Sequence, residues 1–174
     1  MKTRRFDIYK LTYTIDFPVY FLFFGVFLDI LSTFLFVALN AGREAHPILG
    51  ELISISIWFI PVYLFITNAV FVPFLPDVLR KTFSYPIGLS SIFLALNNFS
   101  LVLFENAFLV DTIGYYPLLV LFFLFGLTIF VYLVQKEKLD KKEIISTCLK
   151  LFMFLLFLGL IHALFVVVTW PAFF

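Results

Sequence analysis

The stretch FPVYFLFFGVFLDILSTFLFVAL, residues Phe17 to Leu39, is almost entirely apolar. A helix rises 1.5 Å per residue, so about 20 apolar residues cross a hydrocarbon core of roughly 30 Å. The stretch is therefore long enough to span a membrane. It is too long for the apolar part of a cleaved signal peptide, and no convincing small-x-small cleavage site follows it.

The composition shows that this stretch is not an isolated case. Of the 174 residues, 63% are hydrophobic and 13% are charged, and the mean hydropathy is +1.11, which excludes an ordinary soluble globule. A segment that spans lipid must satisfy its own backbone hydrogen bonds, and these runs lack the alternation of a membrane β-barrel. We therefore predict an all-α integral membrane bundle, a single domain of five transmembrane helices. The predicted spans lie near Phe17–Leu39, Leu52–Val72, Pro86–Phe104, Tyr115–Val134 and Ile144–Thr169.

The distribution of Lys and Arg predicts the orientation of the bundle. Eleven of the twelve bases fall at one set of span ends, and only Arg43 falls at the other. The positive-inside rule then predicts a cytoplasmic N-terminus, an outer C-terminus and a multi-pass protein of the cell (plasma) membrane. Residues 1–16 mix bases with apolar residues, which indicates a basic amphipathic segment on the inner membrane surface. The alternative is an unstructured basic tail that only sets the topology.

Asp29 is the most informative single residue of the first span. A charged side chain at the centre of a membrane helix costs roughly 2.5 to 3.5 kcal/mol on insertion scales, so such a residue is a functional candidate. On a 3.6-residue period, Asp29 shares a face with Gly25, Ser32 and Asn40, with Thr33 beside it. This helix is therefore predicted to turn a polar stripe away from lipid.

Further polar residues are predicted to lie at a similar depth in other spans, or in the loop that follows the first span. Asn97 and Asn98 fall near the middle of the third span, and His162 falls in the outer half of the fifth. Glu44 and His46 follow the first span, in a loop that could fold back toward Asp29, since irregular backbone is tolerated where it lines a cavity. Together these groups could line a polar pocket that opens to the outside.

The first three spans also resemble a known family of proteins. The chain reads Asp29-x-x-Ser32-Thr33, then Gly42-x-Glu44-x-His46-Pro47, with the Asn97-Asn98 pair in a later helix. This resembles the D-x-x-[ST]-T and G-x-E-x-N-P pattern of small archaeal and bacterial multi-pass membrane proteins without an established activity. His46 departs from that pattern, which has Asn there. The resemblance supports the choice of residues and implies no chemistry.

Three classes of function are compatible with this pattern. The first is binding or transport of an ion or small solute, with Asp29 supplying charge and Asn and Ser supplying oxygens. The second is an intramembrane hydrolase or transferase, in which Asp29, Glu44, His46 and His162 bind a divalent metal as cofactor. The third is a structural subunit or anchor, in which the stripe contacts another membrane subunit or a second copy of the chain.

The sequence favours the first class. It carries no H-E-x-x-H or G-x-S-x-G motif, which weakens the enzyme hypothesis. Nucleic acid is not an expected partner, because the bases are dispersed and account for topology. A purely structural interpretation is the alternative to all three classes. In it, Asp29 is a neutral carboxyl that hydrogen-bonds a neighbouring helix.

Overall fold

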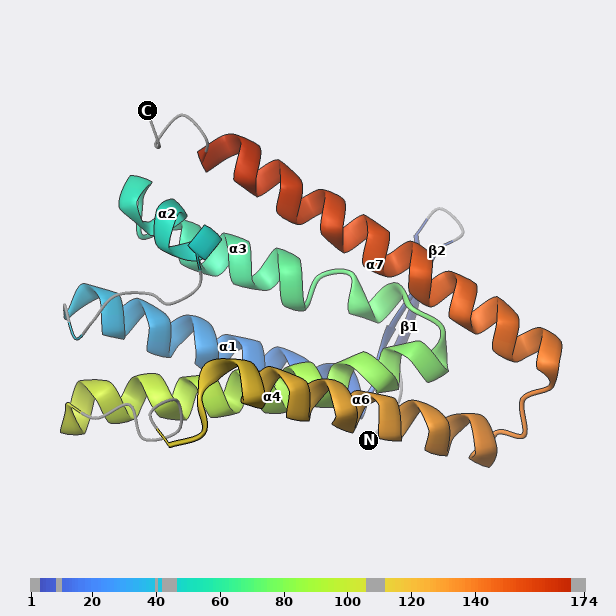
Figure 1. Cartoon of the computed structure of the whole chain (residues 1–174). Coiled ribbons are helices and arrows are strands. Elements are labelled where there is room, and N and C mark those ends of the chain that lie inside the picture. Colours follow the sequence, from blue (N-terminus) through green and yellow to red (C-terminus); the bar gives the residue numbers. More distant parts are fainter. Residues whose placement is uncertain (1–3, 9–10, 40, 42–46, 106–111, 170–174) are drawn as a thin grey trace.

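The computed structural model describes residues 4–8, 11–39, 41, 47–105 and 112–169, and Figure 1 shows the whole chain. Within these residues the chain forms a short β-hairpin followed by helices. The elements, in chain order, are β1 (Arg4–Ile8), β2 (Leu11–Ile15), α1 (Phe17–Ala38), α2 (Pro47–Ile55), α3 (Phe59–Asn68), the 3₁₀ turn η1 (Val72–Phe74), α4 (Asp77–Phe104), α6 (Tyr115–Lys136) and α7 (Lys141–Thr169). The predicted helical fold is confirmed.

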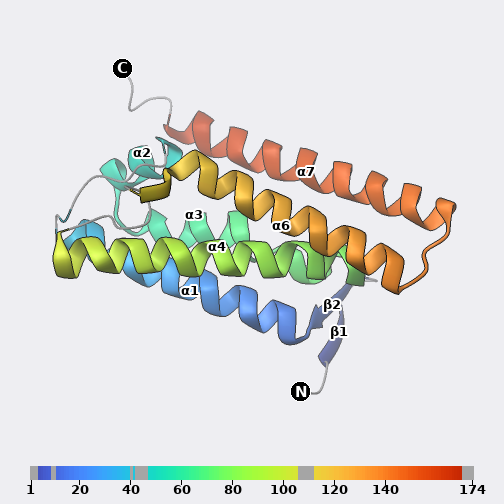
Figure 2. The same cartoon turned by 60° about the horizontal axis from the view of Figure 1, so that its bottom comes forward.

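The long elements lie side by side and alternate in direction. α1, the α2–α3 segment, α4, α6 and α7 each run opposite to the one before (Figures 1 and 2). The hairpin, the start of α4 and the α6–α7 link therefore share one end of the bundle. These are the elements that carry nearly all the described Lys and Arg residues.

Three described helices are long and apolar enough to cross a membrane. They are Phe17–Ala38, Asp77–Phe104 and Lys141–Ile161, while Phe59–Phe74 and Val120–Lys136 are shorter apolar segments. Three of the five predicted spans thus correspond to helices that are long and apolar enough to cross a membrane.

The predicted span Leu52–Val72 is not one continuous helix. It is divided into α2 and α3 at Ser56–Trp58, where the amide N–H of Phe59 bonds the carbonyl of Ser56 at 3.0 Å in a tight turn. A proline inside a helix commonly causes a kink, but Pro61 lies in the first turn of α3. A proline is tolerated there, because the N–H that it lacks would have no partner within the helix. The interruption lies ahead of the proline.

The third predicted span begins earlier than Pro86. α4 starts at Asp77 and continues without interruption through Pro86. Its first turns carry Asp77, Arg80 and Lys81, which pair with one another and with Asp16 at the start of α1. Gly126 of α6 lies against the proline, since a Cβ on Gly126 would be 3.2 Å from Pro86 Cγ.

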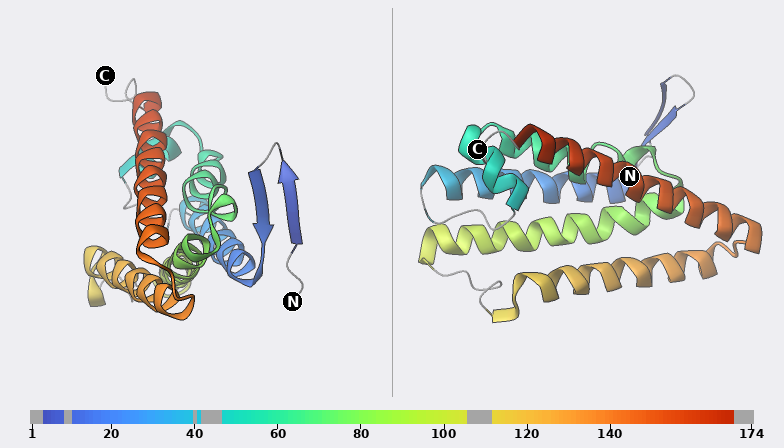
Figure 3. Two further views of the ribbon diagram at one scale, coloured as in Figure 1. Left: turned by 90° about the vertical axis from the view of Figure 1, so that its right-hand side faces the viewer. Right: turned by 45° about the horizontal axis from the view of Figure 1, so that its top comes forward.

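The N-terminal segment is the one departure from an all-helical chain among the described residues. β1 and β2 pair antiparallel, with Phe6 opposite Tyr13 and Ile8 opposite Leu11. Alternating apolar and polar residues, rich in Thr and aromatic types, favour a strand over a helix. The hairpin projects from the end of the bundle (Figure 3).

The core lies between α1, α3 and α4, and the last two helices cover it incompletely. Leu22, Val26, Ala69, Val72 and Phe154 form one buried cluster, and Leu49, Leu52, Ile60, Tyr63 and Leu64 form a second. α7 contacts the core through ring pairs, Phe154 with Phe83 at 5.1 Å and Phe157 with Phe71 at 4.7 Å between centroids. Most apolar side chains of α6 and α7 with described exposure face outward.

Candidate functional site

The predicted polar stripe of α1 is buried against α4. Asp29 is 5% exposed, Ser32 is fully buried and Thr33 is 2% exposed. All three lie in the middle of a 22-residue helix whose other residues are mostly apolar. The stripe therefore faces the inside of the bundle, as its helical period predicts.

Hydrogen bonds join these residues to α4. The amide of Asn98 donates from Nδ2 to Thr33 Oγ1 at 3.1 Å and to Ser32 Oγ at 3.3 Å. Thr33 Oγ1 donates to Asp29 Oδ1 at 3.4 Å, and Ser32 Oγ donates to the backbone carbonyl of Asp29 at 3.0 Å. We call Asp29, Ser32, Thr33 and Asn98 the α1–α4 polar cluster.

The direction of these bonds follows from the chemistry of the groups. An amide NH₂ can only donate, so each hydroxyl accepts from Asn98 and turns its own proton toward Asp29. The carboxyl of Asp29 accordingly receives a donor and lies among neutral oxygen-bearing groups. Such groups suit a hard cation, because carboxylate, hydroxyl and amide oxygens are the ligands that these ions prefer.

The neighbouring amide, Asn97, is also buried. Its exposed fraction is 6%, and Ser91, about two turns earlier on α4, is 3% exposed. The backbone carbonyl of Asn97 accepts a hydrogen bond from Ser100 Oγ at 3.0 Å. The amide of Asn98 hydrogen-bonds Ser32 and Thr33 of α1.

Two glycines bring α1 and α4 close enough for these contacts. A Cβ on Gly25 would lie 2.3 Å from the carbonyl oxygen of Gly88, and a Cβ on Gly88 would lie 2.8 Å from the ring of Phe21. No side chain fits at that separation, so the two backbones touch. Small residues at such crossings are typical of packed membrane helices.

The remaining predicted site residues cannot be placed in this cluster. Asn40, Glu44 and His46 lie outside the described residues, and His162 lies in α7 at a position whose side chain is not described. Within the part of the chain that the structure describes, no group of three or more His, Cys, Asp or Glu side chains could hold a metal ion. The four-residue metal set, Asp29, Glu44, His46 and His162, stays a prediction.

A second polar group, which the sequence analysis missed, lies at the end of the bundle that carries the hairpin. The side chain of Arg80 is 7% exposed and its partner Asp16 is 13% exposed. Arg80 donates from Nε and Nη2 to Asp16 Oδ2 at 3.0 and 2.8 Å, and from Nη1 to the carbonyl of Leu75 at 3.2 Å. Asp77 also pairs with Arg80 and with Lys81.

Asp16 has two roles in this arrangement. Its Oδ1 accepts the backbone N–H of Val19 at 3.3 Å and so caps the start of α1, while Oδ2 binds Arg80. We counted Arg80 only as a topology signal. The sequence Asp16-Phe17-Pro18 has the form of a helix start, and this could have indicated the cap.

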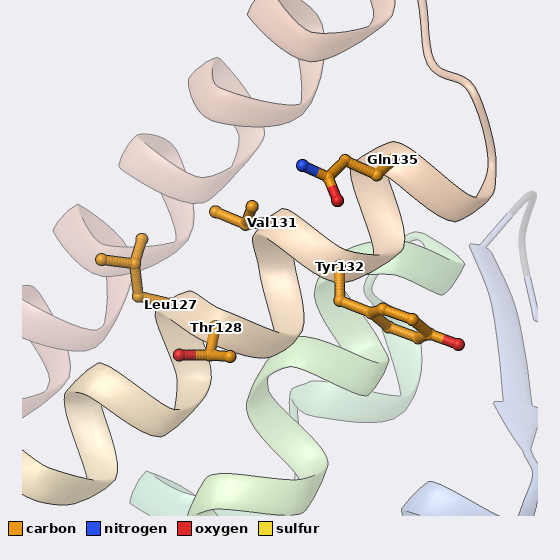
Figure 4. A pocket seen from close by; sticks show the side chains of 5 residues that line it. All are labelled: Leu127, Thr128, Val131, Tyr132 and Gln135. Carbon is orange, nitrogen blue, oxygen red and sulfur yellow. The ribbon is translucent and has the colours of Figure 1, made fainter.

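A shallow groove of about 380 Å³ runs along α6, and no residue of either polar group lines it. Leu127, Thr128, Val131, Tyr132 and Gln135 line it, all from one helix (Figure 4). None of them was a predicted site residue, because apolar side chains on a membrane helix are expected to face lipid.

Comparisons of the chain with protein-family models, curated proteins and solved structures found no match. The resemblance in the first three spans therefore stays a prediction, and the functional argument depends on the geometry alone.

Proposed function

We propose that the chain is a multi-pass protein of the cell membrane, with five crossings and the base-rich end in the cytoplasm. Five successive segments that alternate in direction support this proposal (Figure 1). The bases Arg80, Lys81, Lys136, Lys138, Lys141 and Lys142 belong to elements that meet at one end. The interrupted α2–α3 segment is the proposed second crossing, because both of its helices are apolar and together they extend from Pro47 to Asn68.

We further propose that the α1–α4 polar cluster binds a cation, as part of binding or moving an ion or small solute. The observation that carries this proposal is a buried carboxyl, that of Asp29, which accepts a hydrogen bond from Thr33. Ser32 and Asn98 extend the same network, since Ser32 bonds the backbone carbonyl of Asp29 and Asn98 bonds both hydroxyls. Helix packing alone would be served by neutral residues, whereas an acid at this depth costs several kcal/mol to insert. A bound cation offsets that cost, because it neutralises the carboxylate where water cannot.

A cation would bind through the carboxylate and the neighbouring oxygens. Asp29 supplies the negative charge, and the hydroxyls of Thr33 and Ser32 supply neutral oxygens once their protons turn away. Asn98 supplies its Oδ1 if its amide, which now presents Nδ2 to both hydroxyls, flips over. The Gly25–Gly88 crossing keeps α1 and α4 at a fixed separation, so the oxygens from the two helices stay together. Movement of the ion along the bundle would then require the two helices to change their contact near Asn98.

The proposal is tested by cation-dependent stability of the purified protein in lipid nanodiscs. Thermal unfolding is measured in lithium, sodium, potassium, magnesium and calcium chloride, with choline chloride holding the ionic strength constant. At a concentration 100 times its Kd, a bound cation adds about 2.7 kcal/mol to the free energy of unfolding. We expect one of these cations to raise Tm in the wild type and not in Asp29→Asn.

A charge-matched control separates the site from the general effect of removing an acid. Glu105 is an exposed acid at the C-terminal end of α4, so Glu105→Gln should retain the full cation response. Equal responses in the wild type and Asp29→Asn would reject the cluster as a cation site. Flux of the identified cation into proteoliposomes then separates transport from binding alone.

A further inference from the structure

The groove on α6 has the length of a lipid acyl chain in one leaflet. Its lining residues run from Leu127 to Gln135, which corresponds to about 12 Å along the helix axis. Half of a hydrocarbon core is roughly 15 Å deep. Leu127 and Val131 are about half exposed, so the groove is open along its side, where a chain can enter from the bilayer.

The groove also has a polar end that meets a run of lysines. Gln135 and Tyr132 line it next to Lys136, the last residue of α6. The ammonium of Lys136 lies 5.7 Å from the centroid of the Tyr132 ring, which holds the charge beside the groove. The backbone N–H of Lys138 donates to the carbonyl of Gln135 at 3.3 Å, so a tight turn holds the backbone of Lys138 close to Gln135.

The acids of the α6–α7 link are engaged with other groups. Asp140 and Glu143 accept each other's backbone N–H at 2.8 and 3.0 Å, which forms the N-terminal cap of α7. Glu137 lies 3.9 Å from the ammonium of Lys81. Residues 136–143 hold four lysines and three acids, so their formal net charge is +1. Within the described part of the chain, no ion pair is found for Lys136, Lys138, Lys141 or Lys142.

We propose that this groove and these lysines form a binding site for an anionic glycerophospholipid. One acyl chain lies along Leu127 and Val131, and the headgroup phosphate lies among Gln135, Lys136 and Lys138. The apolar groove and the basic end are contiguous, and this combination of chemistry matches a lipid better than a protein or a soluble anion. The site is separate from the α1–α4 polar cluster and does not depend on the cation proposal.

The test compares lipids that differ in headgroup charge and ligands that differ in the acyl chain. Purified protein, stripped of bound lipid in detergent, is titrated with phosphatidylglycerol, phosphatidylcholine or inorganic phosphate, and binding is followed by native mass spectrometry and by Tm. We expect retention of phosphatidylglycerol and a rise in Tm, with little effect of the other two ligands. Equal binding of both lipids would overturn the proposal, and so would an equal effect of inorganic phosphate.

Variants test the two halves of the site separately. Each of Lys136→Gln and Lys138→Gln should weaken phosphatidylglycerol binding about fivefold, whereas Lys150→Gln, an exposed lysine further along α7, should leave it unchanged. Val131→Trp fills the groove and should weaken binding of the same lipid, whereas Val120→Trp, on α6 and about half exposed like Val131 but outside the groove, should not.

Circular dichroism of each variant shows that it is folded. If Lys138→Gln and Lys150→Gln weakened phosphatidylglycerol binding equally, the lysines would act only through the general surface charge, and the proposed site would be overturned. Equal binding by Val131→Trp and Val120→Trp would overturn the groove. Asp29→Asn should bind the lipid as the wild type does, so failure of the cation proposal is distinguishable from failure of this one.

Discussion

Gly25 of α1 and Gly88 of α4 make a direct backbone contact. A Cβ on Gly25 would lie 2.3 Å from the carbonyl oxygen of Gly88, a separation that no side chain accommodates. The crossing sets the distance between the two helices that carry the α1–α4 polar cluster. It therefore links the packing of the bundle to the geometry around Asp29.

Substitution of Gly25 by Ala tests this link. The added methyl group meets backbone rather than a flexible side chain, so α1 and α4 must separate, at an expected cost of about 3 kcal/mol in the free energy of unfolding. Gly159→Ala is the matched control, because a Cβ there meets nothing within 4 Å. That control should be neutral or up to about 1 kcal/mol stabilising, since Ala is the better helix former. Denaturation of both variants in mixed micelles measures the difference, and equal effects would contradict a tight crossing.

Asn98 provides the hydrogen bonds between the helices. Asn98→Leu removes two bonds to α1, and bonds between membrane helices contribute about 0.6 kcal/mol each on average. We expect a loss of about 1 kcal/mol in the free energy of unfolding. Ser90→Ala, on the same helix, should change it little, because Ser90 Oγ donates only to the carbonyl of Ile87 of its own helix at 2.9 Å. If Ser90→Ala lowered the free energy of unfolding more than Asn98→Leu does, the hydrogen bonds between Asn98 and α1 would not be the source of the stability.

The interaction of Arg80 with Asp16 should stabilise the protein more than any surface pair. Asp16→Asn retains a side chain that can cap α1, yet it removes the negative charge that compensates the buried guanidinium. Breaking a buried pair costs about 3 kcal/mol, and we expect a loss of this order because the only other acid paired with Arg80 in the described residues, Asp77, is 47% exposed. The measurement is again the free energy of unfolding, at low and at high salt. Because the pair is buried, salt should change this loss little.

Glu137→Gln is the control for that prediction. Glu137 and Lys81 are 3.9 Å apart and each is about one third exposed, so this pair should contribute less than about 1 kcal/mol. A loss in Asp16→Asn no larger than in Glu137→Gln would mean that Arg80 is compensated by Asp77 alone.

The sequence predicts the helices and the stripe of α1 well, because both follow from one chain segment and its period. Ser32 and Thr33 lie beside Asp29 on a 3.6-residue helix whatever the neighbouring helix is. The sequence could not decide between Asn97 and Asn98. Successive residues point in directions about 100° apart, so the bonds that Asn98 makes to α1 depend on how the two helices pack and not on the sequence of α4 alone.

Features that depend on contacts between distant segments were predicted less well. Asp16 and Arg80 are 64 positions apart, so neither residue alone indicates the pair. The charged first turn of α4 resembles a loop until its partners are known. The apolar run around Trp58 gives no clear sign of a break, because composition stays hydrophobic across it.

The position of Pro61 leads to a final prediction about that break. Pro61 is the third residue of α3, where its missing N–H has no helical partner. Pro61→Ala should therefore change the free energy of unfolding by less than about 1 kcal/mol. Val62→Pro, at the next position, which is 46% exposed, removes the first bond inside the helix and should cost about 3 kcal/mol. If Pro61→Ala instead caused the larger change, the proline itself would maintain the interruption between α2 and α3.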